Sequence, residues 1–270
     1  DYFLYPDSLD SLTYISQILQ LKAIQYGVEH WRRNRGRCMG SLYWQLNDCW
    51  PVASWASIDY YGRWKALHYG ARRFYAPIMI SASEKEELSP EITYYIHNDT
   101  RKPFTGTVET SLILADFRVL SQQTKEIQAE PLSACPVFSV NYTSWLTGWE
   151  EKTHGFARVR LFEGGQCISE QTTLFVKPKH FSYPKVTYQV RAEEEEKQFA
   201  VTITADGFAQ YVELDFEEWD AVFSDNYFDI TEKEGKTVKV EKAELPLGTS
   251  AEEILGQIKV RSVADSYSVN

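Results

Sequence analysis

Four side chains between residues 44 and 50 have the chemistry of a carbohydrate site. Trp44 and Trp50 carry flat indole rings, which stack on the apolar C–H face of a pyranose. Asn47 and Asp48 lie between them and offer amide and carboxylate groups that bind sugar hydroxyls. We therefore predict that Trp44, Asn47, Asp48 and Trp50 bind substrate. The competing interpretation is that the tryptophans are core residues, which is the usual role of a tryptophan in a strand.

The sequence around these residues favours the sugar site. The segment from Gly40 to Tyr75 contains the sequences WQLND, WP, SW and IDYYGRWK, and it runs on to FYAP. At this spacing, the sequences resemble the end of the catalytic barrel in β-mannosidases of glycoside hydrolase family 2. The resemblance implies that the residues after WQL line a pocket for substrate.

A short apolar run leads into the site. Residues 41–46 are rich in aromatic side chains that favour strands, and the run is too short for a helix. Pro51 cannot donate to a sheet, so the chain must leave it by that point. These features predict a strand over residues 41–46.

Helices are expected on both sides of this strand. Apolar residues at steps of three and four predict a long helix, which Ser8 or Asp10 caps and which closes at Gly36 after a run of arginines. A second helix is predicted over residues 63–74. By resemblance, the order helix, strand, helix is the last turn of a (β/α)8 barrel, a fold whose active sites lie at the carboxyl ends of the strands.

The residues that such a barrel needs for catalysis are not found in this sequence. Retaining glycosidases use two carboxylates about 5–5.5 Å apart. The resemblance implies glutamates after the fourth and seventh strands, and both positions would lie before Asp1. The sequence contains neither the Asn-Glu motif of the acid/base nor a Glu-Phe-Gly type motif of the nucleophile. Of the local carboxylates, Asp59 is interpreted as a turn residue and Asp48 as a group that binds hydroxyls or fixes the loop. We predict no catalytic residue here and an inactive isolated chain.

From Pro77 onward the pattern changes to short strands separated by turn residues, which is typical of a β-sandwich. His97, in the sequence HNDT, is interpreted as a turn or edge residue rather than a ligand. The resemblance implies an immunoglobulin-like domain in this region. Strand-like runs lie at residues 78–81, 91–97, 106–114, 156–162 and 172–176.

A second sandwich is predicted after a hinge at Lys177-Pro178-Lys179. The sequence FSDNYFDI at residues 223–230 resembles a signature of the terminal immunoglobulin-like domain of β-mannosidases. We expect a tight turn at Asp225-Asn226 with the aromatic residues packed inward. The less favoured alternative is a calcium site built from Asp215, Asp225 and Asp229. The predicted strands are 186–190, 199–204, 210–216, 237–240 and 257–262.

Together these features predict a mainly β fold, with two immunoglobulin-like β-sandwiches preceded by the last helix-strand-helix piece of a (β/α)8 barrel. The predicted domains are residues 1–76, 77–177 and 178–270. A change in charge supports the first boundary. Residues 1–76 hold nine Lys or Arg against six Asp or Glu, a net charge of +3, so the remainder carries −13.

Composition excludes several classes of function. The net charge is −10 and the isoelectric point is near 5.1, whereas a nucleic-acid-binding protein needs a basic face. No apolar run approaches the roughly 18 residues of a membrane span. We therefore expect a soluble chain that binds neither nucleic acid nor membrane. We also expect no cofactor and no metal ion.

The four cysteines have no metal-binding spacing. They are interpreted as buried free thiols, which mildly favours a reducing compartment and a cytoplasmic, bacterial-type location. A bridge between Cys135 and Cys167 is the alternative.

The resemblance implies a fragment of a retaining exo-β-mannosidase that removes terminal non-reducing β-D-mannose. One alternative is a fragment of an exo-β-glucosaminidase or β-galactosidase of the same family. Another is a non-catalytic module that binds carbohydrate or buttresses the barrel. The expected partners are a mannoside or oligosaccharide and the remainder of the barrel. Because residues 1–76 would expose apolar faces, we also expect self-association, or docking of their helices onto the first sandwich.

Overall fold

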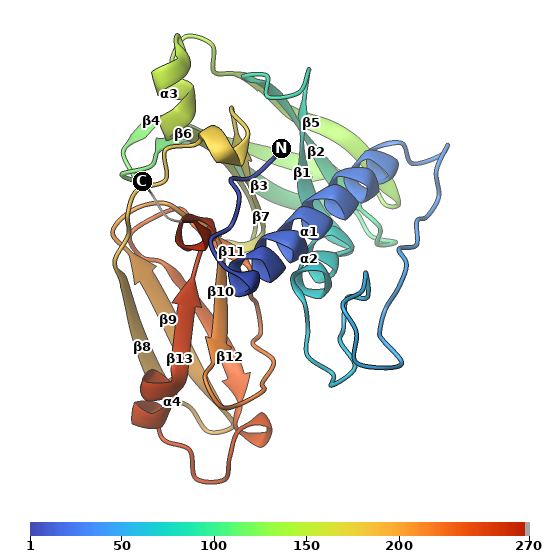
Figure 1. Cartoon of the computed structure of the whole chain (residues 1–270). Coiled ribbons are helices and arrows are strands. Elements are labelled where there is room, and N and C mark those ends of the chain that lie inside the picture. Colours follow the sequence, from blue (N-terminus) through green and yellow to red (C-terminus); the bar gives the residue numbers. More distant parts are fainter. Residues whose placement is uncertain (268–270) are drawn as a thin grey trace. The chain divides into compact units, whose positions relative to one another are not determined.

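The computed structural model describes residues 1–267 and confirms a mainly β fold (Figure 1). All the strand pairs in its four sheets are antiparallel, and the chain divides into two compact units. Unit 1 comprises Asp1–Leu4, Ala23–Leu42 and Ala71–Ser182. Unit 2 comprises Tyr5–Lys22, Tyr43–Gly70 and Tyr183–Asn270. The predicted domain boundaries at 76/77 and 177/178 stay predictions.

Unit 1 holds the first β-sandwich (Figure 1). One sheet has the order β1-β2-β5, and the other has the order β4-β3-β6-β7. A short helix, α3 (Trp149–His154), precedes β6. The strands are β1 (Ile78–Glu84), β2 (Glu91–Asn98), β3 (Phe104–Leu114), β4 (Val119–Ala129), β5 (Ser133–Asn141), β6 (Gly155–Glu163) and β7 (Gln166–Leu174).

The core of this sandwich follows the alternation of the sequence. In β2, Ile92, Tyr94 and Ile96 are buried, because side chains two residues apart share one face of a strand. They join apolar residues of β3 and β6 in one hydrophobic cluster. The sequence patterns identified five of the seven strands but not β4, which is mostly exposed, or β5, which is mostly half-buried.

Unit 2 holds the second sandwich (Figure 1). Its sheets have the orders β12-β9-β8 and β11-β10-β13. A helix, α4 (Ala251–Gln257), has a capping box between Ser250 and Glu253 and was not predicted. The strands are β8 (Tyr188–Glu194), β9 (Gln198–Ala205), β10 (Ala209–Phe216), β11 (Phe228–Ile230), β12 (Lys236–Glu241) and β13 (Ile258–Arg261).

The FSDNYFDI segment is part of this second core. Phe223, Tyr227 and Phe228 are buried, as predicted. The Asn226 side chain accepts a hydrogen bond from the Leu214 backbone N–H and donates one to the Leu214 carbonyl, both at 2.8 Å. Asp229 accepts a hydrogen bond from the Tyr211 backbone N–H. The described residues contain no group of His, Cys, Asp or Glu placed to hold a metal ion, so the calcium interpretation gains no support.

The long helix, α1 (Leu9–Arg33), forms where the sequence predicts it. The Ser8 hydroxyl accepts a hydrogen bond from the Ser11 backbone N–H and so caps its first turn. After the helix ends, Gly36 takes a φ of 95°, a left-handed conformation that favours glycine. The second helix, α2 (Ala66–Phe74), begins three residues later than predicted.

Helix α1 contributes residues to both units. Within unit 2, the Tyr14 hydroxyl donates to the Tyr211 carbonyl of β10 at 2.5 Å. Within unit 1, Gln171 of β7 donates to Glu29 at 3.2 Å. The expected docking of α1 onto the first sandwich is therefore observed for the residues that belong to unit 1.

Three predictions about local structure are wrong. Residues 41–46 form no strand, because the strands of a parallel barrel that would flank them are not among residues 1–267. His97 is neither a turn nor an edge residue: it is buried in β2, the middle strand of its sheet. The four thiols are free, as expected, so Cys135 and Cys167 form no bridge. However, Cys49 and Cys167 are exposed rather than buried.

Candidate functional site

The segment 43–66 of unit 2 contains the predicted site, and backbone hydrogen bonds give it a defined fold. Asn47 and Ile58 form an isolated parallel bridge. The Ile58 backbone N–H donates to the Leu46 carbonyl at 2.8 Å, and the Asp48 N–H donates to the Ile58 carbonyl at 3.2 Å. The backbone groups that a barrel strand would pair with neighbouring strands here bond to the returning loop.

Ser57 lies at the centre of this segment and is fully buried. Its hydroxyl donates to the Leu46 carbonyl at 2.9 Å and lies 3.0 Å from the Tyr43 hydroxyl and 3.1 Å from His68 Nδ1. Burial lowers the pKa of His68 below that of a free histidine. A neutral His68 fits this network, because its Nδ1 atom is hydrogen-bonded to an uncharged hydroxyl group, that of Ser57.

Asp48 is buried beneath the loop. Its Oδ1 atom accepts a hydrogen bond from the Ser54 hydroxyl at 2.6 Å. Its Oδ2 atom lies 3.6 Å from the Lys65 ammonium and accepts no hydrogen bond among the described residues. Since Ser54 and Lys65 both bind its carboxylate, Asp48 ties the two ends of the loop together.

The other three predicted binding residues face outward. Trp44 is 73% exposed and Trp50 is 63% exposed. Asn47 is also exposed, and its amide donates to the adjacent Asp48 carbonyl at 3.3 Å. The interpretation of these tryptophans as core residues is therefore wrong for this chain, since the side chains of Trp44 and Trp50 are both largely exposed to solvent.

Further aromatic side chains surround the predicted residues. Trp55, Tyr60 and Tyr61 are each more than half exposed, although none of them is among the four predicted substrate-binding residues. Their position in the same aromatic-rich segment as Trp44 is the sequence signal that could have identified them. By contrast, Trp64 contacts His68 edge-on, with ring centroids 4.3 Å apart, and so serves packing.

Asp59 has the turn role that the sequence indicates. Its Oδ1 atom accepts hydrogen bonds from the backbone N–H groups of Tyr61 and Arg63, and its Oδ2 atom accepts one from the Arg63 guanidinium. Gly62 completes the turn with a φ of 89°. With Asp59 held in the turn and Asp48 buried, neither carboxylate has the open position that a nucleophile requires.

Two family models match the two sandwiches. A domain described as a Mannosidase Ig/CBM-like domain matches residues 91–180, and an Ig-fold domain of mannosidases matches residues 181–266. A solved β-D-mannosidase from Dictyoglomus thermophilum superposes with a TM-score of 0.82 at 26% identity, covering 97% of this chain and 31% of that one. The chain is related to the β-mannosidases of glycoside hydrolase family 2. Its fold class and its immunoglobulin-like sandwiches are those of this family.

Curated relatives of the family show the same likeness. The β-mannosidase of Bos taurus is 29% identical over 98% of this chain and 32% of its own length. The β-mannosidase of Rattus norvegicus is 45% identical over a segment covering 27% of this chain and 9% of its own length. This chain therefore spans about a third of the length of the curated relatives that match most of it.

A solved exo-chitosanase from Amycolatopsis orientalis shares the fold, with a TM-score of 0.66 at 16% identity over 94% of this chain and 34% of that one. At this identity the likeness concerns the fold alone. In the described residues, no helix is long and apolar enough to cross a membrane.

Proposed function

We propose that this chain is the carboxyl-terminal part of a retaining exo-β-mannosidase that removes terminal non-reducing β-D-mannose. The similarity to the Dictyoglomus thermophilum β-D-mannosidase over 97% of the chain is the observation that carries this proposal. It extends through the segment 43–66, where the exposed aromatic residues lie.

In the proposed site, Trp44 and Trp50 stack on sugar rings and Asn47 binds hydroxyls. Asp48 does not contact the sugar in this proposal. Its carboxylate binds Ser54 and Lys65, and it thereby fixes the loop that carries Trp44, Asn47 and Trp50. The two glutamates that perform the hydrolysis would come from the remainder of the barrel. The reaction needs no cofactor, since glycoside hydrolysis by two carboxylates supplies its own acid, base and nucleophile.

The sandwiches themselves have a structural role in this proposal. Their large aromatic residues are mostly buried, among them Tyr94 and Phe156 in the first and Phe199 and Phe208 in the second. Aromatic residues packed in cores favour a buttressing role, whereas a polysaccharide platform would need a row of exposed rings.

Hydrolysis of p-nitrophenyl β-D-mannoside tests the proposal. The assay compares the isolated chain with a longer polypeptide in which it follows a β-mannosidase barrel. We expect the longer polypeptide to release p-nitrophenol and the isolated chain to release none. The proposal would be overturned if the longer polypeptide preferred the β-D-glucosaminide or β-D-galactoside. Turnover by the isolated chain would contradict the predicted absence of catalytic residues.

Variants of the longer polypeptide test the individual residues. We expect Trp44→Ala and Trp50→Ala to lower kcat/KM by about tenfold or more, because each removes a stacking surface. Trp149→Ala is the matched control, since Trp149 of α3 is similarly exposed at 62% but lies in the first sandwich. Equal losses in all three variants would show that the effect is not specific to residues 44–50.

A further inference from the structure

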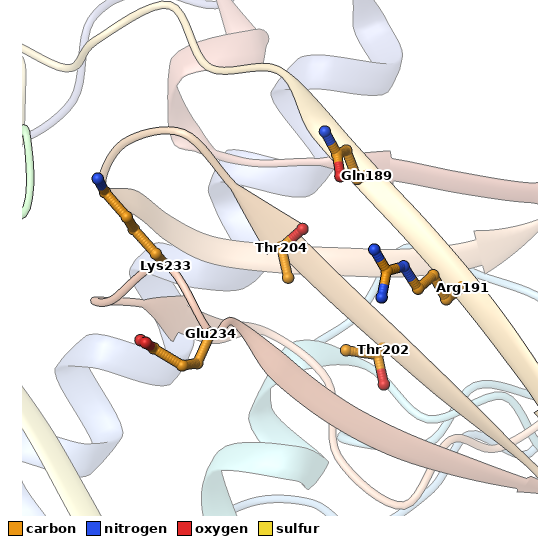
Figure 2. A pocket seen from close by; sticks show the side chains of 6 residues that line it. All are labelled: Gln189, Arg191, Thr202, Thr204, Lys233 and Glu234. Carbon is orange, nitrogen blue, oxygen red and sulfur yellow. The ribbon is translucent and has the colours of Figure 1, made fainter.

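The outer face of the second sandwich carries a groove that is lined by residues with polar or charged side chains and has no assigned role. The groove has a volume of about 420 Å³, within the range of about 300–1,000 Å³ that small-molecule sites occupy. It lies over β8 and β9 and beside the turn that precedes β12 (Figure 2). Its lining residues are Gln189, Arg191, Thr202, Thr204, Lys233 and Glu234.

The strand register builds the floor of the groove. Gln189 pairs with Thr204 and Arg191 pairs with Thr202 across β8 and β9. The alternate residues of β9, such as Ile203, are buried in the core, so these four polar side chains share the opposite face. Figure 2 shows the Arg191 guanidinium reaching from β8 toward the two threonines on β9.

The turn that carries Lys233 and Glu234 forms one wall, and Gly235 fixes its position. Gly235 has a φ of 69°, and a Cβ atom there would overlap the Ile203 carbonyl oxygen. Only glycine allows this approach of the turn to β9. The wall is therefore a defined part of the sandwich.

The charged side chains of the groove indicate that its ligand carries a negative charge. The Arg191 guanidinium makes no hydrogen bond or ion pair within residues 1–267. By contrast, Lys239 of β12 contacts Glu195 at 3.3 Å, and Lys242, which directly follows that strand, contacts Glu194 at 2.6 Å. In Figure 2 the Glu234 carboxylate points away from Arg191. An unpaired guanidinium flanked by hydroxyls binds a carboxylate or sulfate through two parallel hydrogen bonds.

The remaining lining indicates what carries that anion. Thr202, Thr204 and Gln189 supply hydroxyl and amide groups suited to sugar hydroxyls. No aromatic ring lines the groove, so a neutral pyranose has no stacking surface there. We propose that this groove binds an acidic oligosaccharide through its carboxylate or sulfate group. The proposal concerns binding alone and does not depend on the proposed hydrolysis.

Isothermal titration of the whole chain tests the inference with four probes: a carboxylated oligomannuronate, a sulfated heparin hexasaccharide, neutral mannohexaose and inorganic sulfate. We expect one or both acidic oligosaccharides to bind, and which one binds identifies the anion. Mannohexaose and inorganic sulfate should bind at least about tenfold more weakly. The absence of binding by both acidic probes at millimolar concentration would overturn the proposal, as would equal affinity for inorganic sulfate.

Variants separate specific recognition from general charge attraction. We expect Arg191→Ala to weaken binding by about tenfold and Arg191→Lys to recover only part of the loss, because lysine lacks the planar fork. Lys239→Ala is the matched control, since it removes the same charge from the same sheet outside the groove. Equal weakening by Arg191→Ala and Lys239→Ala would overturn the assignment of the groove. Circular dichroism of each variant shows that the fold is retained.

Discussion

At the scale of single residues, Asn226 shows how the FSDNYFDI segment shapes the terminal sandwich. Its side-chain amide bonds both the N–H and the carbonyl of Leu214, as the backbone of a neighbouring strand would. Asn226 is itself buried. The segment therefore acts through a side chain that substitutes for a strand partner.

Replacing Asn226 with alanine should lower the free energy of unfolding by roughly 2–4 kcal/mol, because it leaves two buried backbone groups unpaired. Urea denaturation followed by circular dichroism measures the change. Asp220→Ala is the control: Asp220 is exposed and makes a long 3.8 Å ion pair with Arg63, so its loss should cost at most about 0.5 kcal/mol. An equal effect of both variants would contradict the role assigned to Asn226.

His97 gives the first sandwich a dependence on pH. Burial lowers its pKa from 6.5 to about 3, and the charges of Arg32, Arg33 and Arg35 act in the same direction. Between these two values the unfolded chain binds a proton that the folded chain does not. The folded state is therefore most stable, with respect to the titration of His97, above pH 6.5, and its free energy of unfolding decreases as the pH falls from 6.5 toward 3.

We expect His97 to account for a loss of about 2 kcal/mol in the free energy of unfolding between pH 7 and pH 5. His97→Gln removes the titrating group, so its stability should fall less over this range. His30→Gln, at an exposed position on α1, should keep the wild-type dependence. Denaturation midpoints at a series of pH values test this, and identical slopes for the wild type and His97→Gln would contradict the prediction.

At the scale of elements, a comparison of two glycines with positive φ distinguishes the cost of backbone strain from the cost of steric overlap. Gly164, in the turn between β6 and β7, has a φ of 56° and open space around it. Gly235 combines a positive φ with close contact to the backbone of β9.

Gly164→Ala should therefore cost about 1 kcal/mol of stability, from backbone strain alone. Gly235→Ala should cost more, by about 1–3 kcal/mol, because the turn must move away from Ile203. Thermal unfolding of both variants gives the comparison. If the two variants were equally stable, the turn before β12 would be free to move and the groove would lack a fixed wall.

The sequence predicted the elements whose signal is local. Helix α1 has a clear apolar period and a capping serine. Strand β9 alternates strictly between half-buried and buried positions, and β2 alternates in the same way over its first six residues. Strand β4 was missed because both of its faces are mostly polar. The strand expected at 41–46 is absent because pairing with distant strands, rather than propensity, stabilises a parallel strand.

In the candidate site, too, the residue types could be predicted from the sequence, whereas their burial could not. Residue types indicated Trp44, Asn47, Asp48 and Trp50, and their role in binding stays a prediction. The sequence did not show that Asp48 is buried while the others face solvent, since this depends on the hydrogen bond from Ser54 and the ion pair with Lys65. The groove over β8 and β9 was not identified, because its residues are far apart in the sequence and common on strand surfaces.

At the scale of the whole molecule, the exposed apolar residues of the segment 43–66 lead us to expect self-association. Leu46 is 55% exposed and lies among exposed tryptophans, and such patches commonly mediate contacts between chains. Among the apolar residues of helix α1, Leu12 and Leu19 are also exposed, whereas Ile15 is buried and is not available for such contacts.

Size-exclusion chromatography with light scattering should show a mass that rises with protein concentration. Leu46→Lys should shift the chain toward the monomer, because a charge in the patch opposes contact. Leu247→Lys, at a fully exposed site in the second sandwich, should leave the association unchanged. A strict monomer at all concentrations would contradict the expectation.

The exposed thiol of Cys49 adjoins Trp50 in the candidate site. Because a solvent-exposed cysteine reacts readily with maleimides, this position is suited to a fluorescent label. Cys167 is also exposed, so it would first be changed to serine. A dye on Cys49 would then respond to a sugar that stacks on the neighbouring indole. The chain thus contains an attachment point from which occupancy of its candidate site can be followed in real time, without turnover.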